Sequence, residues 1–424
     1  MCGIAGFIDL KNRLDRQHLE AMTSSIGHRG PDDFGLLVVD SPYARVGLGH
    51  RRLSILDLSP LGHQPMSFNN YHLIFNGEIY NFKEIKKELE EKGHTFKSNS
   101  DTEVILKSFI EWREKCVDRF IGMFVFCVYD ANEEKIYIYR DRAGVKPLYY
   151  YWSHDCFLFA SELKAFHKIQ LFEKQIEKHS LKLYLDYGYI PTPHTIFKHT
   201  FKLEPGFFLR FDLRKGSFER IKYWDVADFY NKDKLAISSS DATDEMEQIL
   251  ISAFKYRMVA DVPVGVFLSG GYDSSIVTGI LQKHTNQQIK TFSIGFAEKQ
   301  FNEAPHAKAV SEYLGTDHTE YYCTAEEAAK ILPKLPYMYD EPFGDSSAIP
   351  TTLVSQLAVQ QVKVALSADA GDETFAGYSK YDQFFNYYNQ LNKVPFPVSE
   401  AVQFGTTHMR PILTKLFSNA YNID

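Results

Sequence analysis

The second residue of the chain is a cysteine that could act as an N-terminal nucleophile. Cys2 directly follows Met1, and a side chain this small normally permits removal of the initiator methionine. The freed α-amine, with a pKa of about 7.7–8, can then take the thiol proton at neutral pH, so that one residue supplies both nucleophile and base. The alternative is a small, buried cysteine without chemistry, which is the better interpretation of Cys2 taken alone.

Four motifs further along the chain favour the nucleophile. They are His28-Arg29-Gly30-Pro31-Asp32, Arg52-Leu53-Ser54-Ile55, Asn76-Gly77-Glu78-Ile79-Tyr80-Asn81 and Ser100-Asp101-Thr102-Glu103. A guanidinium such as Arg52 is a natural partner for an amino acid's α-carboxylate, and Asp101 and Glu78 could hold its α-ammonium. Together with Cys2, the four motifs resemble the glutaminase domain of class II glutamine amidotransferases.

The resemblance implies a set of site residues around Cys2. The oxyanion of the tetrahedral intermediate would be held by the Asn76 side chain and the Gly77 backbone N–H. Because Gly77 lacks a Cβ, its backbone can approach the thioester closely. Residues expected to contact glutamine are Arg52, Leu53, Ser54, Ile55, Leu56, Asn76, Gly77, Glu78 and Asp101.

Each of these residues also has a purely structural interpretation. Arg52 could be a surface cation, and Asn76-Gly77 could be a simple hairpin turn. Asp101 could be the N-cap of a helix that Thr102-Glu103 opens. The occurrence of Cys2 and Arg52 in the same pattern puts the functional interpretation ahead.

A second motif lies in the later part of the chain, where an apolar strand over Val262–Leu268 runs into Ser269-Gly270-Gly271-Tyr272-Asp273-Ser274-Ser275. The Gly-Lys-Ser/Thr ending of a Walker A loop is absent. Small residues at a strand-to-helix turn still present backbone N–H groups that can cradle an anion. The heptad resembles the pyrophosphate loop of ATP pyrophosphatases, and the alternative is a glycine-rich turn without a ligand.

An acidic cluster follows the expected strand Val362–Leu366. Its sequence is Ser367-Ala368-Asp369-Ala370-Gly371-Asp372-Glu373, which should lie at the same sheet edge as the glycine-rich loop. Carboxylates there could hold Mg²⁺ against departing pyrophosphate, with Asp273 and Asp372 as the expected ligands. An acidic start of a helix is the alternative.

The order of all these motifs resembles glutamine-hydrolysing asparagine synthetase from Cys2 to about Tyr378. Further matching segments are 140–150, Ser161-Glu162-Leu163-Lys164 and Tyr223-Trp224-Asp225. The resemblance implies hydrolysis of glutamine, adenylation of the aspartate side chain by MgATP, and transfer of ammonia through an intramolecular tunnel to give asparagine, glutamate, AMP and pyrophosphate. The residues it implies for ATP are Leu268, Ser269, Gly270, Gly271, Asp273, Ser274, Ile294, Ser367 and Ala368.

The chain departs from the family pattern in two places. Ala368 and Ala370 stand where glycines are usual, and Asp369, a catalytic candidate, would be a shorter acid-base or ammonia-orienting group than glutamate. Only 46 residues follow Tyr378, whereas the family continues through a helical region that supplies a catalytic lysine. None of Lys380, Lys393 and Lys415 can be matched to it, so we expect a C-terminally incomplete synthetase domain.

The elements that must position these residues change character along the chain. The first two hundred residues read as short β-segments around Gly3–Asp9, Tyr71–Phe75, Phe120–Tyr129, Lys135–Arg140 and Phe157–Ser161, with helices at Phe82–Leu89 and Val104–Trp112. After a polar stretch near Ala236–Asp244, strands alternate with helices. Asp244 and Glu245 suit the start of the first of these helices.

This change in the pattern of strands and helices predicts two fold classes in one chain. By resemblance, the α+β part is an N-terminal αββα sandwich over residues 2–200. A connecting segment over 201–240 then leads to a synthetase domain over 241–424. We expect this domain to be α/β, with a doubly wound, mostly parallel sheet that binds its ligand at the carboxyl ends of the strands.

Composition excludes several classes of function. The balance of 47 Lys+Arg against 54 Asp+Glu gives a net charge of −7, so no global field draws the chain to nucleic acid or acidic membranes. No apolar run or signal peptide is evident, and the five cysteines form no CxxC pair. We therefore expect a cytoplasmic enzyme whose partners are small molecules, with a homodimer as an open option.

The reaction class leaves several alternatives open. The same chemistry could act on another carboxylate acceptor, such as a uronic acid in surface polysaccharide. A β-lactam-forming synthetase is disfavoured because Cys2 implies working glutamine hydrolysis. A shortened synthetase half would leave a glutaminase only, or a nonenzymatic remnant.

Overall fold

The computed structural model describes residues 1–391 apart from 286 and 298–301. Lys393 and Lys415, considered above as candidates for a catalytic lysine, lie outside these residues. The chain divides into two compact units, Met1–Leu366 and Ser367–Asp424, which we treat separately.

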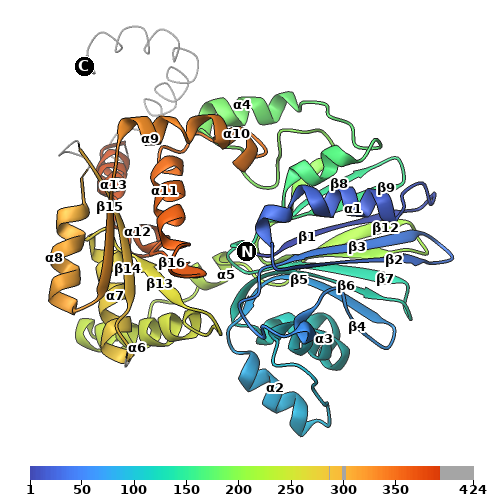
Figure 1. The fold of residues 1–424 in the computed structure, drawn as a ribbon, viewed down its shortest axis with the longest axis horizontal. Coiled ribbons are helices and arrows are strands. Elements are labelled where there is room, and N and C mark those ends of the chain that lie inside the picture. Colours follow the sequence, from blue (N-terminus) through green and yellow to red (C-terminus); the bar gives the residue numbers. More distant parts are fainter. Residues whose placement is uncertain (286, 298–301, 392–424) are drawn as a thin grey trace. The chain divides into compact units, whose positions relative to one another are not determined.

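Two six-stranded sheets make up the first half of the larger unit (Figure 1). The first has the order β10-β8-β9-β1-β3-β2. Its strands are β1 (Gly3–Asp9), β2 (Asp33–Asp40), β3 (Arg45–Arg52), β8 (Tyr149–Ser153), β9 (Cys156–Ala160) and β10 (Thr200–Lys202). The second has the order β12-β11-β7-β6-β5-β4. Its strands are β4 (Met66–Phe68), β5 (Tyr71–Ile79), β6 (Gly122–Asp130), β7 (Lys135–Arg140), β11 (Phe207–Asp212) and β12 (Ser217–Lys222). All neighbouring strands within both sheets are antiparallel.

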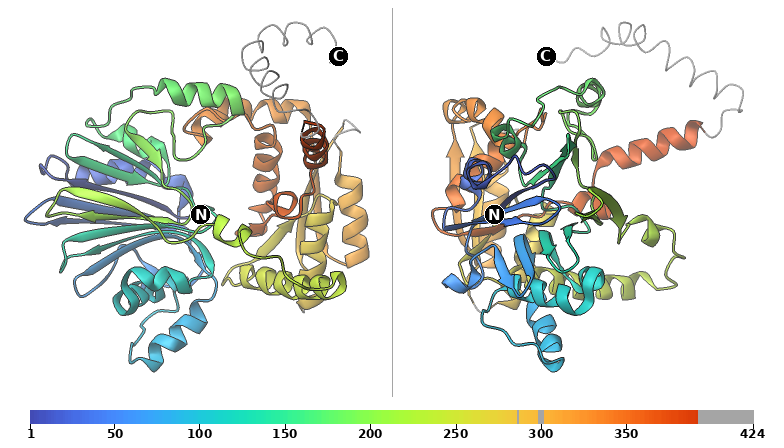
Figure 2. Two further views of the ribbon diagram at one scale, coloured as in Figure 1. Left: turned by 180° about the vertical axis from the view of Figure 1, so that it is seen from behind. Right: turned by 90° about the vertical axis from the view of Figure 1, so that its right-hand side faces the viewer.

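Three apolar cores stack these sheets between helices. One core joins β1 and β9 to α1 (Arg16–Ser25) and to the short helix η4 (Leu163–Lys168). A second core lies between the two sheets, and a third joins the second sheet to α2 (Phe82–Glu91) and α3 (Asp101–Trp112). Figure 2 shows the two sheets face to face from behind. The layers therefore run α, β, β, α, which confirms the predicted sandwich.

Aromatic residues fill these cores. The largest fully buried side chains are mostly Phe and Tyr, among them Tyr129, Phe126 and Phe157. Phe126, Tyr139 and Phe208 stack in a row across three neighbouring strands, with ring centroids 4.5 and 4.6 Å apart. Cross-strand aromatic pairs of this kind stabilise sheets beyond the area they bury.

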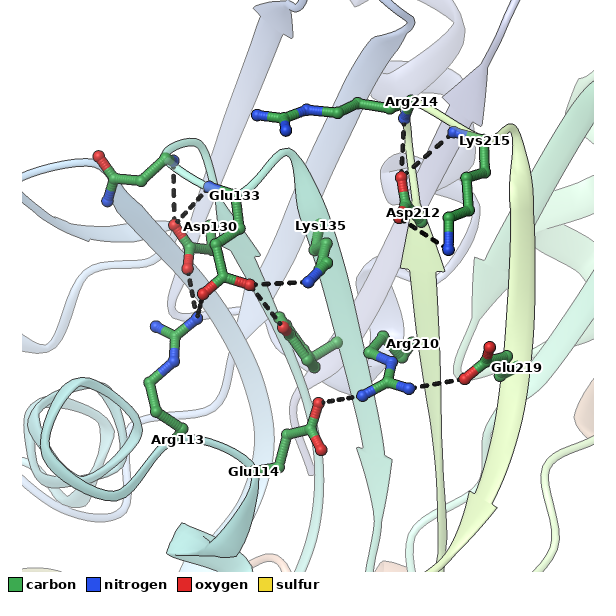
Figure 3. A network of polar contacts seen from close by, with 12 residues as sticks. Arg113, Glu114, Asp130, Glu133, Lys135, Arg210, Asp212, Arg214, Lys215 and Glu219 are labelled. Atoms are coloured by element: carbon green, nitrogen blue, oxygen red, sulfur yellow. Dashed lines mark hydrogen bonds and ion pairs between the residues drawn. The ribbon is translucent and has the colours of Figure 1, made fainter.

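A network of ion pairs ties the second sheet to the short helix η3 (Arg113–Arg119) (Figure 3). Arg113 contacts the buried Asp130 at 2.6 Å and Glu133 at 2.8 Å. Arg210 bridges Glu114 on η3 at 2.7 Å and Glu219 on β12 at 2.6 Å. These ion pairs hold η3 against the last residue of β6, the turn between β6 and β7, and β11.

The strands predicted from sequence are confirmed in place, with β1 and β7 matching their expected bounds. β5 is longer than expected and carries Asn76-Gly77 inside it, paired with Val125 and Phe124 of β6, so the hairpin-turn interpretation is wrong. The strand β3 had no clear sequence signal because Arg45–Arg52 is rich in glycine and cations.

The second half of the larger unit contains a parallel sheet of order β15-β14-β13-β16. Its strands are β13 (Val264–Phe267), β14 (Lys290–Phe296), β15 (Asp317–Cys323) and β16 (Val364–Leu366). α7 (Tyr272–His284) contacts β13, α8 (Ala304–Leu314) contacts β14 and β15, and α11 (Ala348–Ala358) packs on Phe292 of β14. Figure 1 shows α8 and α11 on opposite sides of the sheet, which confirms the doubly wound prediction.

The helix before this sheet starts earlier than predicted. α6 (Ser239–Arg257) begins after Ser238, whose side chain accepts a hydrogen bond from the Asp241 backbone N–H. Asp244 and Glu245 therefore lie in the helix interior, because an N-cap hydroxyl decides the start better than an acidic first turn does.

The remaining helices are short or peripheral. They are α4 (Lys178–Tyr187), α5 (Ala227–Tyr230), α9 (Ala325–Ala329) and α10 (Leu335–Met338), and in the smaller unit α12 (Gly371–Phe375) and α13 (Ser379–Leu391). The predicted capping box of Thr324 and Glu327 at α9 is confirmed. Over the described residues, no helix combines the length and apolar character needed to cross a bilayer.

Candidate active site

Cys2 lies at the start of β1, directly beside the end of β3. The backbone N–H of Leu53 donates to its Sγ at 3.3 Å, and its thiol donates to the Leu53 carbonyl at 3.6 Å. Arg29 Nε donates to the Cys2 carbonyl at 2.9 Å. Burial raises the pKa of the Cys2 thiol, so the resting thiol keeps its proton and needs a base before it can attack.

The two predicted oxyanion donors lie within β5. Asn76 is 1% exposed, and neither its amide nitrogen nor its amide oxygen has a hydrogen-bond partner among the described residues. A buried amide without a hydrogen-bond partner costs free energy, so the Asn76 amide suits a group that donates its hydrogen bond to a bound ligand. A Cβ on Gly77 would lie 2.1 Å from the Met123 carbonyl oxygen, so only glycine fits this strand pairing.

Arg52 at the end of β3 is 6% exposed, which excludes the surface-cation interpretation. Its guanidinium donates to backbone carbonyls of the following loop, to Ser59 at 3.0 Å and also to Asp57. These bonds fold the loop 53–59 around the guanidinium, which also borders the pocket beside Cys2.

Two carboxyl groups, those of Asp101 and Glu78, line this pocket. Asp101 is not a helix N-cap, because Ser100 caps α3 and Asp101 Oδ2 instead accepts the Ile79 N–H at 2.9 Å. Burial raises the pKa of Asp101 to about 7. Burial and the charge of Asp101 together raise the pKa of Glu78, whose Oε2 is buried without a hydrogen-bond partner in the described part of the chain. A cation placed between the two would relieve both penalties, so the geometry suits an ammonium group.

The structure brings most of the predicted glutamine residues to one pocket. The predicted residues that line it are Cys2, Arg52, Leu53, Ile55, Leu56, Gly77, Glu78 and Asp101. Two predicted residues, Asn76 and Ser54, are not part of this lining. Ser54 lines a neighbouring cleft with Asp32 and Lys363, and its N–H donates to Asp32 Oδ2 at 2.8 Å.

Sequence reasoning missed five residues that line the pocket. They are Gly62, Gln64, Phe75, Ser100 and Thr102. Gln64 links β5 to α3 at the pocket, because its Oε1 accepts the Phe75 N–H at 2.6 Å and its Nε2 donates to Thr102 Oγ1 at 3.2 Å. Ser100 and Thr102 belong to the motif around Asp101 but were not predicted to contact glutamine, whereas Gln64 carries no chemical signal in the sequence.

The glycine-rich loop joins β13 to α7 as predicted. Gly270 has φ +86°, and a Cβ there would lie 2.6 Å from the Ala307 nitrogen, so the loop requires glycine at this position. Ser269 Oγ and Ser274 Oγ lie 3.0 Å apart and brace the turn. Gly271 is the N-cap of α7 and has no side chain to accept a hydrogen bond, which leaves the first N–H groups of this 13-residue helix without a side-chain cap.

Other predicted nucleotide residues flank this loop. Leu268 is buried and its N–H donates to the Phe292 carbonyl at 2.9 Å, while Ile294 lies further along β14. Asp273 stands in the first turn of α7. These residues share the carboxyl end of the parallel sheet, where α/β proteins bind ligands.

The acidic cluster belongs to the smaller unit. Ser367 Oγ donates to Asp369 Oδ2 at 2.6 Å, and Ala368 lies between them. Ala370 has φ +72°, a left-handed conformation that costs a residue with a Cβ about 1 kcal/mol. Asp372 and Glu373 stand in the first turn of the short helix α12. Within the described residues, no group of three or more His, Cys, Asp or Glu is arranged to hold a metal ion.

Comparison with known proteins covers both halves of the chain. Residues 1–224 match the family model of the glutamine amidotransferase domain, and residues 245–419 match that of asparagine synthase. A putative glutamine-hydrolysing asparagine synthetase 2 of Methanocaldococcus jannaschii is 41% identical over 400 residues, or 89% of this chain and 76% of that protein.

Two Bacillus subtilis proteins give similar alignments. Asparagine synthetase 1 is 37% identical over 90% of this chain and 59% of its own length, and asparagine synthetase 3 is 34% identical over 89% and 63%. The chain therefore spans about three fifths of these bacterial relatives. The two family matches and the archaeal relative together show that this chain belongs to the glutamine-hydrolysing asparagine synthetase family.

Proposed function

We propose that the chain is a glutamine-dependent asparagine synthetase, in which Cys2 hydrolyses glutamine and the released ammonia amidates aspartate activated by ATP. The names of the relatives and the two family matches support this reaction. The observation that carries it is the pocket in which the Cys2 thiol, held at 3.3 Å by the Leu53 N–H, shares its lining with Arg52, Gly77, Glu78 and Asp101.

The glutaminase step needs the Cys2 α-amine to be free. After removal of Met1, the α-amine takes the thiol proton and the thiolate attacks the glutamine carboxamide carbon. The Asn76 amide and the Gly77 N–H hold the oxyanion, and ammonia leaves with the proton returned by the amine. Water then cleaves the thioester to give glutamate. Asp101 and Glu78 hold the α-ammonium, and Arg52 with the loop that it shapes holds the α-carboxylate.

The synthetase step relies on the loop between β13 and α7. The uncapped N–H groups at the start of α7 and the close backbone packing at Gly270 fit an anionic phosphate chain, so the loop residues Ser269 to Ser274 would bind ATP. A carboxylate is a poor acyl donor until adenylated, after which ammonia displaces AMP.

Mg²⁺ would enter with the nucleotide. It usually takes one or two carboxylates, waters and substrate phosphates rather than a dedicated protein cage. By resemblance to the family, Asp273 and Asp372 are the candidates for these carboxylate ligands. When bound, the ion would neutralise charge on the departing pyrophosphate.

The acceptor and the setting of the reaction are also proposals. Aspartate is favoured over a uronic acid by the names of the relatives. Cys2, Cys116, Cys127 and Cys156 form no disulfide, which fits a reducing compartment such as the cytoplasm. A homodimer stays a prediction.

Product analysis tests the proposal. Incubation with glutamine, MgATP and aspartate should yield asparagine and pyrophosphate in equal amounts, with at least as much glutamate. Glutamate release without pyrophosphate would leave a glutaminase only. Pyrophosphate with uronic acids but not with aspartate would change the acceptor.

A further inference from the structure

A buried lysine close to the chain start has no role in the chemistry above. Lys146 belongs to the segment 140–150 that resembles the family, and it is 2% exposed. Its backbone N–H donates to Asp141 Oδ2 at 3.0 Å, which fixes the segment after β7. Its ammonium reaches the N-terminal residue and donates to Met1 Sδ at 3.0 Å.

Removal of Met1 would take away this contact. Among the described residues, Met1 Sδ is the one hydrogen-bond partner of the Lys146 ammonium. The freed side chain would then face the new α-amine of Cys2. Burying an ammonium without a hydrogen-bond partner costs free energy, so a lysine at this buried position calls for a functional reason.

The charges around the chain start show what the ammonium could do. Arg29 binds the Cys2 carbonyl and pairs with Glu162, so its charge is largely compensated. The carboxylates of Glu78 and Asp141 interact electrostatically with the Lys146 ammonium. Asp141 already accepts three backbone N–H groups, from Phe124, Val145 and Lys146, whereas Glu78 Oε2 has no hydrogen-bond partner in the part of the chain that the structure describes.

Resting on the function proposed above, we propose that Lys146 is a positioning residue for the N-terminal nucleophile. Its ammonium stands next to the α-amine and favours the uncharged form of that amine, which can take the thiol proton. It also balances the Glu78 carboxylate, which binds the ammonium of the substrate.

The electrostatics of the site agree with this geometry. Burial lowers the pKa of Lys146 to about 8, so the side chain is mostly charged at neutral pH. Burial is also the main cause that lowers the pKa of the Met1 α-ammonium to about 6, and the charges of Arg29 and Lys146 contribute. The same cations will act on the Cys2 α-amine once it is exposed.

The test replaces the charge and keeps the bulk. Lys146→Met removes the ammonium from a side chain of similar length, and Lys146→Arg restores a cation. Lys107→Met is the matched control, because Lys107 is also buried at 3% exposure but its ammonium lies over the Phe68 ring, away from Cys2. Intact mass must first show that all variants lack Met1.

Two measurements give the readout. The acidic limb of kcat/KM for glutamine hydrolysis should move to higher pH by about one unit in Lys146→Met, and not in Lys146→Arg or Lys107→Met. Alkylation of Cys2 by iodoacetamide without glutamine should slow severalfold at pH 7 in the same variant. Ammonia-dependent asparagine synthesis should not change.

The outcomes separate this inference from the proposed function. A wild-type protein that releases no glutamate from glutamine overturns the function itself. A working wild type with an unmoved acidic limb and unchanged alkylation in Lys146→Met overturns the role of Lys146. An equal change in Lys107→Met would show a general effect of losing a buried lysine and would also overturn it.

Discussion

Replacement of Asn76 by leucine should remove glutaminase activity while stabilising the fold. Both polar atoms of the Asn76 amide are buried without a partner among the described residues. A buried unsatisfied polar group costs about 1–3 kcal/mol, so Asn76→Leu, which keeps the bulk and improves the fit to a strand, should raise the free energy of unfolding by a similar amount. Loss of one oxyanion donor should lower kcat about 10²–10³-fold.

Asn81→Leu provides the matched control. Asn81 is also buried, but its amide is satisfied: Nδ2 donates to the Arg119 carbonyl at 2.9 Å and Oδ1 accepts the Ile121 N–H at 2.8 Å. Leucine at this position leaves the Arg119 carbonyl and the Ile121 N–H without their hydrogen-bond partner, which should lower the free energy of unfolding by about 2–4 kcal/mol. The two variants therefore differ in the sign of their effect on stability.

Urea denaturation followed by tryptophan fluorescence measures this difference. Trp112, Trp152 and Trp224 are the three tryptophans of the chain, and all lie in the segment that matches the amidotransferase family. A midpoint for Asn76→Leu that falls as far as that for Asn81→Leu would refute the reasoning, since it would make the Asn76 amide a structural hydrogen-bonding group. Glutamate release within a fewfold of wild type would refute the oxyanion role.

Three further predictions address the nucleophile, the nucleotide loop and pH. Cys2→Ala should abolish glutamine-driven asparagine synthesis and spare ammonia-driven synthesis; loss of both in a folded variant would contradict two separate sites. Gly270→Ala places a methyl 2.6 Å from the Ala307 nitrogen, so pyrophosphate release should fall at least tenfold while glutamate release persists, and unchanged ATP cleavage would exclude the loop. Burial raises the pKa of Asp101 from 3.8 to about 7, so the folded state binds a proton that the unfolded state releases, and stability declines as pH rises through this range. Asp101→Asn should therefore stabilise the protein at pH 8 and hardly at pH 4 in urea melts, and equal effects at both values would contradict a buried carboxyl.

The sequence was most informative where chemistry and local structure agree. Cys2, Gly77 and the Ser269–Ser274 loop could be found because few residue types can perform these tasks. The capping box at Thr324 and the apolar strands followed from local rules that the tertiary structure does not override.

It was less informative where burial depends on distant partners. Asn76-Gly77 has the local preference of a turn, yet pairing with β6 places it inside a strand. Arg52 is buried because carbonyls of its own loop satisfy the guanidinium, and Gln64 reaches the pocket through bonds to Phe75 and Thr102. Such contacts exist only once the two sheets are stacked.

The central claim is that one chain couples glutamine hydrolysis at Cys2 to ATP-dependent amidation of aspartate. The most direct measurement follows ¹⁵N from glutamine labelled at its side-chain amide, in the presence of MgATP, aspartate and excess unlabelled ammonium. We expect ¹⁵N-labelled asparagine, with total asparagine equal to the pyrophosphate released, and no label in asparagine made by Cys2→Ala. Labelled ammonia in solution without pyrophosphate or asparagine would contradict it.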